Sequence, residues 1–182
     1  QEIVTRIVNH SNFNPLKSEL FQAFLIASYI DEETEVAESS EAMINIMNIL
    51  CKYDSENGKL IRFDNLLPNG KSYFTSIDRN LKNLQELVAF FLDHNVDVNT
   101  PDANGVYPLE YAIGINSLNF VKTLIKSRKV DFSKRLNQKS SNFMGGNNQT
   151  YLHLAAICKD TNILSELLKL NLIDINSIDD LG

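Results

Sequence analysis

The sequence predicts an all-α fold, a solenoid of antiparallel helix pairs joined by hairpin or loop fingers. Three observations predict it. Glycine-containing turns recur at Gly70 and Gly105, about 35 positions apart, near the period of roughly 33 residues found among helical repeats. Short segments after these turns carry apolar residues at helical spacing. Helices this short bury an apolar stripe only against their neighbours, which favours a stacked array.

The composition is that of an ordinary soluble chain. It has 182 residues, 43% apolar and 22% charged, enough for one domain or one solenoid segment. A net charge of −6 argues against nucleic acid as a partner. Cys51 and Cys158 form no CxxC, which indicates reduced thiols in a cytoplasmic or nuclear protein. Apolar stretches fall short of the ~20 residues of a spanning helix, so membrane insertion is not expected.

The clearest unit begins with the run Thr150–Ala156, Thr-Tyr-Leu-His-Leu-Ala-Ala. The pattern Ile-Leu-x-x-Leu-Leu follows at 163–168, and Ile-Asp-Ile-Asn at 173–176 closes the unit. This order resembles the ankyrin repeat, in which a Thr-Pro-Leu-His-x-Ala first helix precedes a second helix and an Ala-Asp-Val-Asn hairpin. The resemblance implies an ankyrin-repeat solenoid whose fingers project from the helix pairs.

The same order recurs upstream. Residues 102–112 repeat the turn, a Pro-Leu pair and an alanine, and residues 95–99 close the unit before them. The resemblance therefore covers about four divergent repeats in a domain at 15–182, and the chain is expected to be a fragment of a larger protein. The units are assigned to 15–66, 67–101, 102–144 and 145–178, with the start of a further repeat at 179–182 and an N-terminal cap or the end of a preceding repeat at 1–14.

Several positions depart from the family pattern. Thr75 and Glu110 replace the histidine, and Tyr107 and Tyr151 stand where threonine and proline are usual. Asn116 replaces the glycine that ends the first helix. Asparagine tolerates the left-handed conformation used at helix ends, so this exchange is expected to preserve the turn.

Two inserts interrupt the pattern. Residues 31–40 are acidic, and the connection 135–149 exceeds the usual finger by about ten residues. Surface insertions cost little closure entropy, so a tolerated loop is the simpler interpretation of each. The functional interpretation makes the first an electrostatic contact with a basic partner, and the second a partner-contacting loop anchored by Phe143.

No catalytic constellation is visible. The histidines His10, His94 and His153 have no metal-ligand spacing, and no phosphate loop, dinucleotide fingerprint, HExxH or GxSxG occurs. We therefore expect no enzyme, no cofactor and no metal. The resemblance implies that His153 bonds to backbone near the hairpins and ties neighbouring units together. The basic region 128–139 predicts at most a weak patch for an acidic partner.

Ankyrin partners usually lie across the fingers and the exposed side of the first helices. Val106, Ile115 and Ile157 are apolar at positions expected to face solvent there, which favours a binding groove over scattered exposed residues. Asn99 and Asn176 occupy the hairpin asparagine that is a hydroxylation target in some animal ankyrin proteins, but structural hydrogen bonding in the turn is the simpler interpretation. The partner-binding residues that the resemblance implies are Pro68, Asn69, Lys71, Arg79, Asn80, Ala103, Asn104, Val106, Gly114, Ile115, Asn147, Gln149, Ile157 and Cys158. The functional interpretation of the second insert adds Phe143.

The sequence thus favours a non-catalytic protein–protein interaction module that binds a protein or peptide. An alternative is that the segment is a targeting or regulatory arm of a multidomain enzyme or effector. A helical enzyme that only mimics the repeat is the weakest hypothesis, because no catalytic residues are apparent.

Overall fold

The computed structural model describes residues 44–45, 47–49, 51–52, 63, 66–67, 69–79, 84–136, 147–158 and 161–182. Its named helices are α4 (Leu84–Asp93), α5 (Pro108–Gly114), α6 (Leu118–Lys126), α7 (Tyr151–Ile157) and α8 (Thr161–Leu170). Helical residues also occur between 44 and 52, within the unit assigned to 15–66. Within the described ranges, pairing between extended segments is limited to an isolated antiparallel bridge between Leu136 and Gln149.

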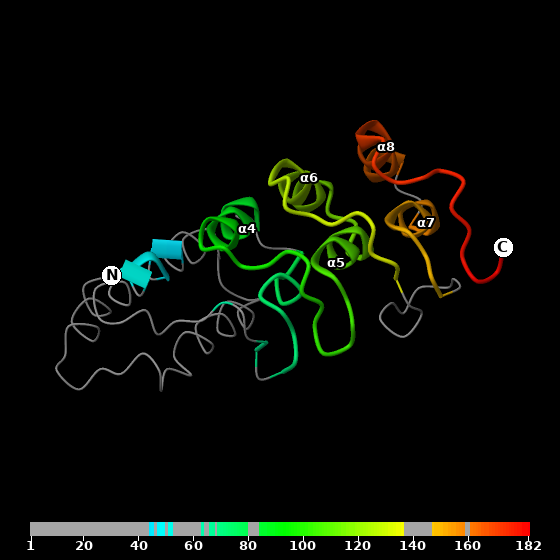
Figure 1. The fold of residues 1–182 in the computed structure, drawn as a ribbon. Helices are drawn as coiled ribbons and strands as arrows, with labels where there is room; N and C mark the ends of the chain where they lie inside the picture. The colour runs from blue at the N-terminus through cyan, green and yellow to red at the C-terminus, as the bar shows by residue number, and fades with distance from the viewer. Residues whose placement is uncertain are drawn as a thin grey trace.

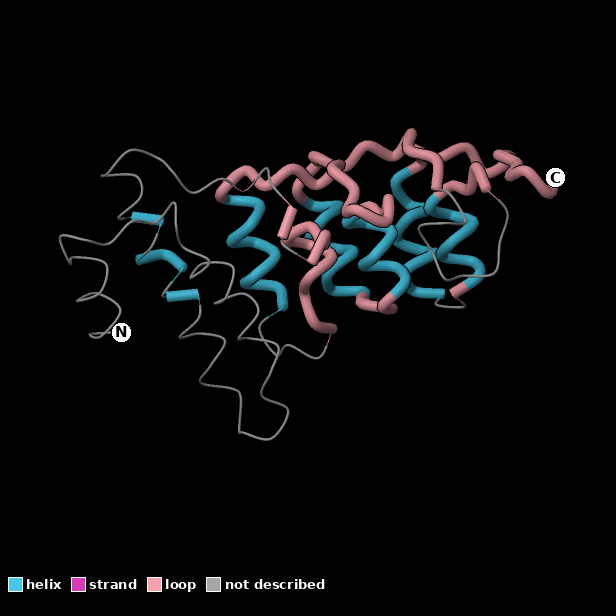
Figure 2. The backbone as a smooth tube through the Cα atoms, turned by 90° about the horizontal axis from the view of Figure 1, so that it is seen from below, coloured by secondary structure: helices cyan, strands magenta, loops and turns pink. Residues whose placement is uncertain are grey.

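The helices form two rows. Helices α4, α6 and α8 follow one another in an outer row, and α5 and α7 lie side by side in an inner row (Figure 1). Contacts within the pairs α5–α6 and α7–α8 join the rows. Loops run along one edge of the array, and short turns between paired helices lie at the opposite edge (Figure 2). This arrangement confirms the predicted all-α solenoid.

A continuous apolar core fills the space between the rows. Leu109, Ala112 and Ile113 of α5 are fully buried, as their helical spacing predicts. Phe120 of α6 contacts the Phe74 ring, with centroids 6.3 Å apart. Because each helix pair shares its buried surface with the next, the stability of the array depends on stacking.

Left-handed residues end the helices. Asn116 has φ of 56°, which confirms that it replaces the usual glycine after α5. Asn95, Arg128 and Asn171 have φ between 51° and 57° just after α4, α6 and α8. A left-handed conformation is unfavourable for arginine. At Arg128 it is therefore maintained by the surrounding repeat structure and not by the residue's own preference.

The second unit differs from the expected pattern in its first helix. Tyr73–Ser76 form a single turn, closed by a 3.0 Å bond from the Ser76 N–H to the Ser72 carbonyl. The Ser76 hydroxyl also donates to the Tyr73 carbonyl at 2.8 Å, and hydroxyls that bond to nearby backbone compete with helix propagation. No helix among the described residues is both long and apolar enough to cross a bilayer.

Candidate functional site

Three finger turns share one geometry. They comprise residues 67–70, 102–105 and 179–182, and their glycines have φ of 78°, 86° and 92°. In each turn the glycine N–H donates to the carbonyl of the first residue, at 2.8, 2.9 and 3.3 Å respectively. Positive φ at the last position explains why glycine recurs there.

Within the described residues, an aspartate organises the hairpins that follow α4, α6 and α8. The carboxylates of Asp97, Asp131 and Asp174 accept a hydrogen bond from the N–H two residues later, at 2.9, 3.0 and 2.9 Å. The hydroxyl and N–H of Ser133 bond to Asp131 and lower the pKa of its carboxyl group. These aspartates therefore hold the hairpins in a common shape.

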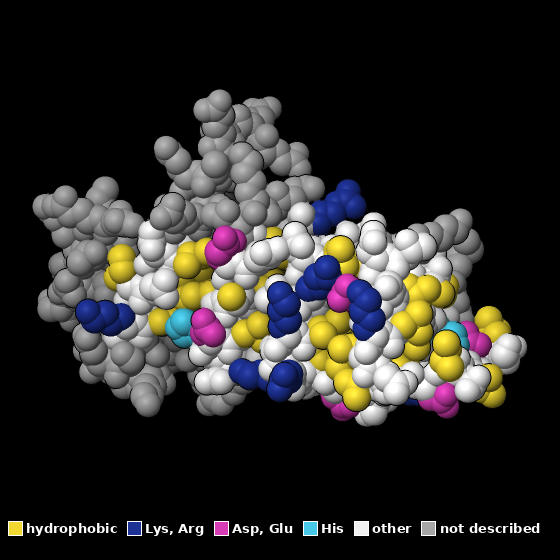
Figure 3. Space-filling model, turned by 90° about the horizontal axis from the view of Figure 1, so that it is seen from above, with side chains coloured by type: hydrophobic (Ala, Val, Ile, Leu, Met, Phe, Trp, Pro, Cys, Tyr) yellow, Lys and Arg dark blue, Asp and Glu magenta, His cyan; other side chains and the backbone are white. Residues whose placement is uncertain are grey.

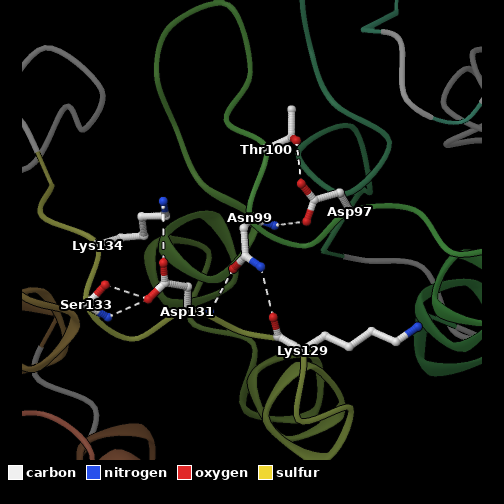
Figure 4. A network of polar contacts seen from close by, with 7 residues as sticks. All are labelled: Asp97, Asn99, Thr100, Lys129, Asp131, Ser133 and Lys134. Carbon is white, nitrogen blue, oxygen red and sulfur yellow. Dashed lines mark hydrogen bonds and ion pairs between the residues drawn. The ribbon is translucent and has the colours of Figure 1, made fainter.

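Asn99 connects two hairpins (Figure 4). Its Nδ2 donates to the Lys129 carbonyl at 2.8 Å, and its Oδ1 accepts the Asp131 N–H at 2.8 Å. The side chain thus satisfies one donor and one acceptor of the next hairpin. The expected structural bonding of Asn99 is confirmed, and it extends between units rather than within one turn.

The fingers are also bonded to one another. The Ala103 N–H donates to the Gly70 carbonyl at 2.8 Å, and the Asp180 N–H donates to the Asn147 carbonyl at 3.1 Å. The backbones come so close that a Cβ added to Gly70 would lie 2.9 Å from the Ala103 Cβ. Neighbouring fingertips are therefore held in register by backbone contacts.

Three different residue types, at the position that holds histidine in the family pattern, accept a backbone N–H in the same way. Oε2 of Glu110 accepts the Tyr107 N–H at 3.2 Å, and Nδ1 of His153 accepts the Thr150 N–H at 3.1 Å. Oγ1 of Thr75 accepts the N–H of Ser72 at 2.9 Å. Each side chain satisfies a donor at the start of its turn or helix, so the substitutions preserve the cap.

A family model of three ankyrin repeats matches residues 76–179. The chain belongs to the ankyrin-repeat family. No curated protein and no solved structure matches it. Ankyrin repeats generally act as protein–protein interaction modules and are typically non-catalytic.

His153 bonds to backbone, as the ankyrin resemblance implied, but to the backbone of its own unit. Within the described residues its hydrogen bonds go to Thr150, the N-cap of its own helix, and not to a neighbouring unit. The pKa of Asp179 is lowered first by the hydrogen bond from the Leu181 N–H and then by that from the Gln149 amide. Asn99, by contrast, bonds to the hairpin of the next unit.

The ankyrin finger of the fourth unit is enlarged at its tip. Leu136 and Gln149 exchange two backbone bonds, at 2.8 and 3.1 Å, just as the Asp102 N–H bonds to the Val106 carbonyl at 3.0 Å. Three residues, 103–105, connect the two sides of the base in the shorter finger. Twelve residues, 137–148, connect them in the longer finger. The insert thus begins and ends at a paired base, which explains how the array tolerates it.

The predicted partner-binding residues fall into four groups. Asn69, Lys71, Arg79, Ala103, Asn104 and Asn147 are exposed; Val106, Gly114, Ile115, Ile157 and Cys158 are half-buried. Pro68, Asn80 and Phe143 lie outside the described residues, as do the acidic insert 31–40 and most of the loop 135–149.

Gln149 forms the fourth group, because its side chain is 4% exposed. Its Nε2 donates to Asp179 at 3.3 Å, so it joins the fourth unit to the last turn. A side chain held in this way is not available to a partner, and the structure places it inside the array.

The predicted basic region is largely engaged within the chain. Lys129 Nζ donates to the Leu92 carbonyl at 3.1 Å, and Lys134 pairs with Asp131 at 3.4 Å. Figure 3 shows further Lys and Arg side chains over the middle of the outer row, where Lys122 lies 3.7 Å from Glu166. This dispersal and pairing leave little concentrated charge for an acidic partner.

Tyr111 is an interunit residue that the sequence analysis missed. It projects from the inner helix α5, and its hydroxyl donates to the Ile77 carbonyl at 2.6 Å. Burial, followed by the nearby Asp78 carboxylate, raises the pKa of Tyr111. Its position next to Ala112 and Ile113 in a short helix gives no sign of this bond, because the sequence does not show how far α5 lies from the preceding unit.

The described residues hold no group of three His, Cys, Asp or Glu side chains that could bind a metal ion. Cys158 is half-buried and packs partly against the core. Cys158 follows the last residue of α7, and a half-buried cysteine at the end of a helix commonly serves as a small packing residue.

Proposed function

We propose that the chain is a non-catalytic ankyrin module that binds a protein or peptide across its fingers and inner-helix face. The carrying observation is the row of exposed fingertip residues, Asn69, Lys71, Ala103 and Asn104, fixed by the bond from the Ala103 N–H to the Gly70 carbonyl. A partner that binds there meets side chains already held in place, which lowers the entropy lost on binding.

The inner helices extend this surface away from the fingers. Arg79 is exposed, and Ile115 and Ile157 are half-buried near the C-terminal ends of α5 and α7, helices that contact each other. Half-buried apolar side chains beside exposed polar ones have the composition of an interface with an apolar centre and a polar rim. This composition, and its extension from the fingers along the inner helices, favour a segment of protein over a small molecule as the partner.

The experiment compares two matched double variants. Lys71→Glu with Asn104→Arg changes the fingers, whereas Lys126→Glu with Asn119→Arg makes the same exchanges at exposed positions of α6 in the outer row. Each is used for affinity capture from cell extract, with quantitative mass spectrometry. Proteins captured by the parent chain should be lost with the finger variant and retained with the α6 variant. Equal retention or equal loss with both variants would refute the placement.

A further inference from the structure

Two fingertips carry the same chemically reactive pair of residues. Asparagine directly precedes glycine at 69–70 and at 104–105, at the ends of the turns 67–70 and 102–105, and also at 57–58, outside the described residues. The side-chain amide of an asparagine is open to attack by the backbone nitrogen of the residue that follows it. Glycine has no Cβ to hinder this approach, so the Asn-Gly pair favours the reaction.

The side chain of Asn104 is unrestrained. It is exposed, and within the described residues its amide makes no hydrogen bond; its backbone N–H donates to the Asp102 carboxylate at 2.9 Å. The reacting nitrogen is held by the bond from the Gly105 N–H to the Asp102 carbonyl, also at 2.9 Å. Once that bond opens, the Asn104 amide is free to rotate toward the Gly105 nitrogen.

Asn69 also precedes a glycine, but it is held more firmly. Its Oδ1 accepts the Lys71 N–H at 3.0 Å, and the Gly70 N–H donates to the Leu67 carbonyl at 2.8 Å. The Gly70 carbonyl accepts the Ala103 N–H at 2.8 Å. A Cβ added to Gly70 would lie 2.9 Å from the Ala103 Cβ, so the backbone has little room to turn. Ring closure at Asn69 must therefore break two bonds that have no counterpart at Asn104 among the described residues.

We propose that Asn104 is a site of spontaneous modification, at which its side chain and the Gly105 nitrogen close a cyclic imide. The Gly105 nitrogen bonds to Cγ of Asn104, its proton passes through water to Nδ2, and Nδ2 leaves as ammonia. Water then adds to either imide carbonyl and opens the ring, which gives aspartate or isoaspartate. Water is the co-reactant, and the step needs no oxidant or reductant.

The modification changes the charge and shape of this fingertip. Either product places a carboxylate in the turn where the Asp102 carboxylate accepts the N–H groups of Asn104 and Val106, at 2.9 and 3.0 Å. Isoaspartate also adds a methylene to the backbone before Gly105, which displaces the Gly105 N–H from its bond to Asp102. An effect on partner binding rests on the proposed function, because Asn104 belongs to that surface. The conversion itself does not.

The test follows conversion in the whole chain at neutral pH and body temperature. Peptide mapping by mass spectrometry measures deamidation at Asn69 and Asn104 in the same molecules. A need to open two further hydrogen bonds slows a reaction by roughly ten-fold or more, so Asn104 should convert at least that much faster than Asn69. In concentrated urea the two rates should approach each other, because the native bonds are then absent.

Two variants examine the cause. Ala103→Pro lacks the N–H that holds the Gly70 carbonyl, and proline suits the second position of such a turn, where Pro68 stands in the preceding finger. This variant should convert several-fold faster at Asn69. Asn104→Gln retains an exposed amide but should abolish the rapid conversion, since glutamine would have to close a larger ring.

The proposal fails if the folded parent chain converts Asn69 as fast as Asn104. It also fails if Asn104 converts no faster than Asn119, an exposed asparagine that precedes phenylalanine in α6. A difference between Asn69 and Asn104 that persists unchanged in urea would assign it to the flanking sequence, against the role given to the hydrogen bonds of the fingers. None of these readouts involves a partner, so they are independent of the capture experiment above.

Discussion

The side-chain amide of Asn99 donates a 2.8 Å hydrogen bond to the backbone carbonyl of Lys129, 30 positions later in the chain. A second bond returns from the Asp131 N–H to the Asn99 Oδ1, also at 2.8 Å. A single side chain therefore supplies both a donor and an acceptor to the next hairpin. A solenoid is stabilised largely by contacts between neighbouring units. Loss of the Asn99 side chain is therefore expected to lower the free energy of unfolding of the array.

Asn99→Ala should lower the free energy of unfolding by about 1–3 kcal/mol, since the Asp131 N–H and the Lys129 carbonyl both lose a partner in a partly buried site. Urea denaturation followed by circular dichroism measures the change. Asn176→Ala is the matched control, because its side chain bonds to no following hairpin among the described residues. It should change stability by less than about 0.5 kcal/mol. Equal losses would contradict the role given to Asn99.

Gly70→Ala should destabilise the fingers more than Gly182→Ala. Both glycines have positive φ, but only at Gly70 would the new Cβ meet another atom, the Ala103 Cβ at 2.9 Å. We expect each alanine to cost about 1–2 kcal/mol through the backbone alone, with a further loss at Gly70 from this contact. Unfolding curves of the two variants give the comparison, and a smaller loss at Gly70 would show that the fingertips can move apart.

Much of the array could be predicted because local signals agree with the global fold. The turn glycines, the apolar spacing of α5 and the helix-ending Asn116 each depend on backbone conformation within a few residues. Burial of Gln149 could not be predicted, because it depends on pairing with Leu136 across the insert. The reach of Asn99 likewise depends on the distance between stacked hairpins, which sequence spacing does not give.

The short first helix of the second unit, a single turn at Tyr73–Ser76, could not be predicted from the sequence either. Ser72 and Thr75 bond reciprocally through side chains and backbone, so the start of the turn is capped as in a longer helix. The sequence pattern reveals the cap but not the length of the helix after it. For the proposed partner surface, exposure of Asn104 and partial burial of Ile115 emerge only once the fingers and helices are packed.

Glu110→Leu should cost about 1–3 kcal/mol, because the Tyr107 N–H loses its acceptor at the start of α5. Glu110→Gln retains a side-chain oxygen of similar reach and should lose appreciably less. The two variants are compared by urea denaturation at neutral pH. A loss with glutamine as large as that with leucine would mean that the negative charge, and not the capping bond, is what the buried site requires.

Tyr151 predicts an alkaline limit to stability. Burial, and then the nearby Glu110 carboxylate, raises the pKa of its phenol well above the usual value. The unfolded chain therefore releases this proton first, and the stabilisation, complete below about pH 10, falls progressively above it. Tyr151→Phe should leave stability near pH 7 almost unchanged and weaken its decline between about pH 10 and 11. Parallel declines in parent and variant, measured by urea denaturation, would rule out Tyr151 as the cause.

The insert at residues 137–148 should be removable without unfolding the array. Its base, Leu136 paired with Gln149, has the bond that Asp102 makes to Val106 in the shorter finger, and Asn148 has φ of 63° where Gly105 has 86°. Replacing residues 137–148 by Ala-Asn-Gly, copied from 103–105, should therefore join the same backbone positions. Closure entropy varies slowly with loop length, so the free energy of unfolding should change by less than about 1 kcal/mol.

Affinity capture with this shortened chain then decides between the two interpretations of the insert. If the loop is a tolerated insertion, the captured proteins should match those of the parent chain, because the fingertips at Asn69 and Asn104 are unchanged. Loss of captured proteins with stability preserved would instead assign the loop to the partner surface. A large loss of stability would show that residues 137–148 support the array itself, against the paired base at Leu136 and Gln149.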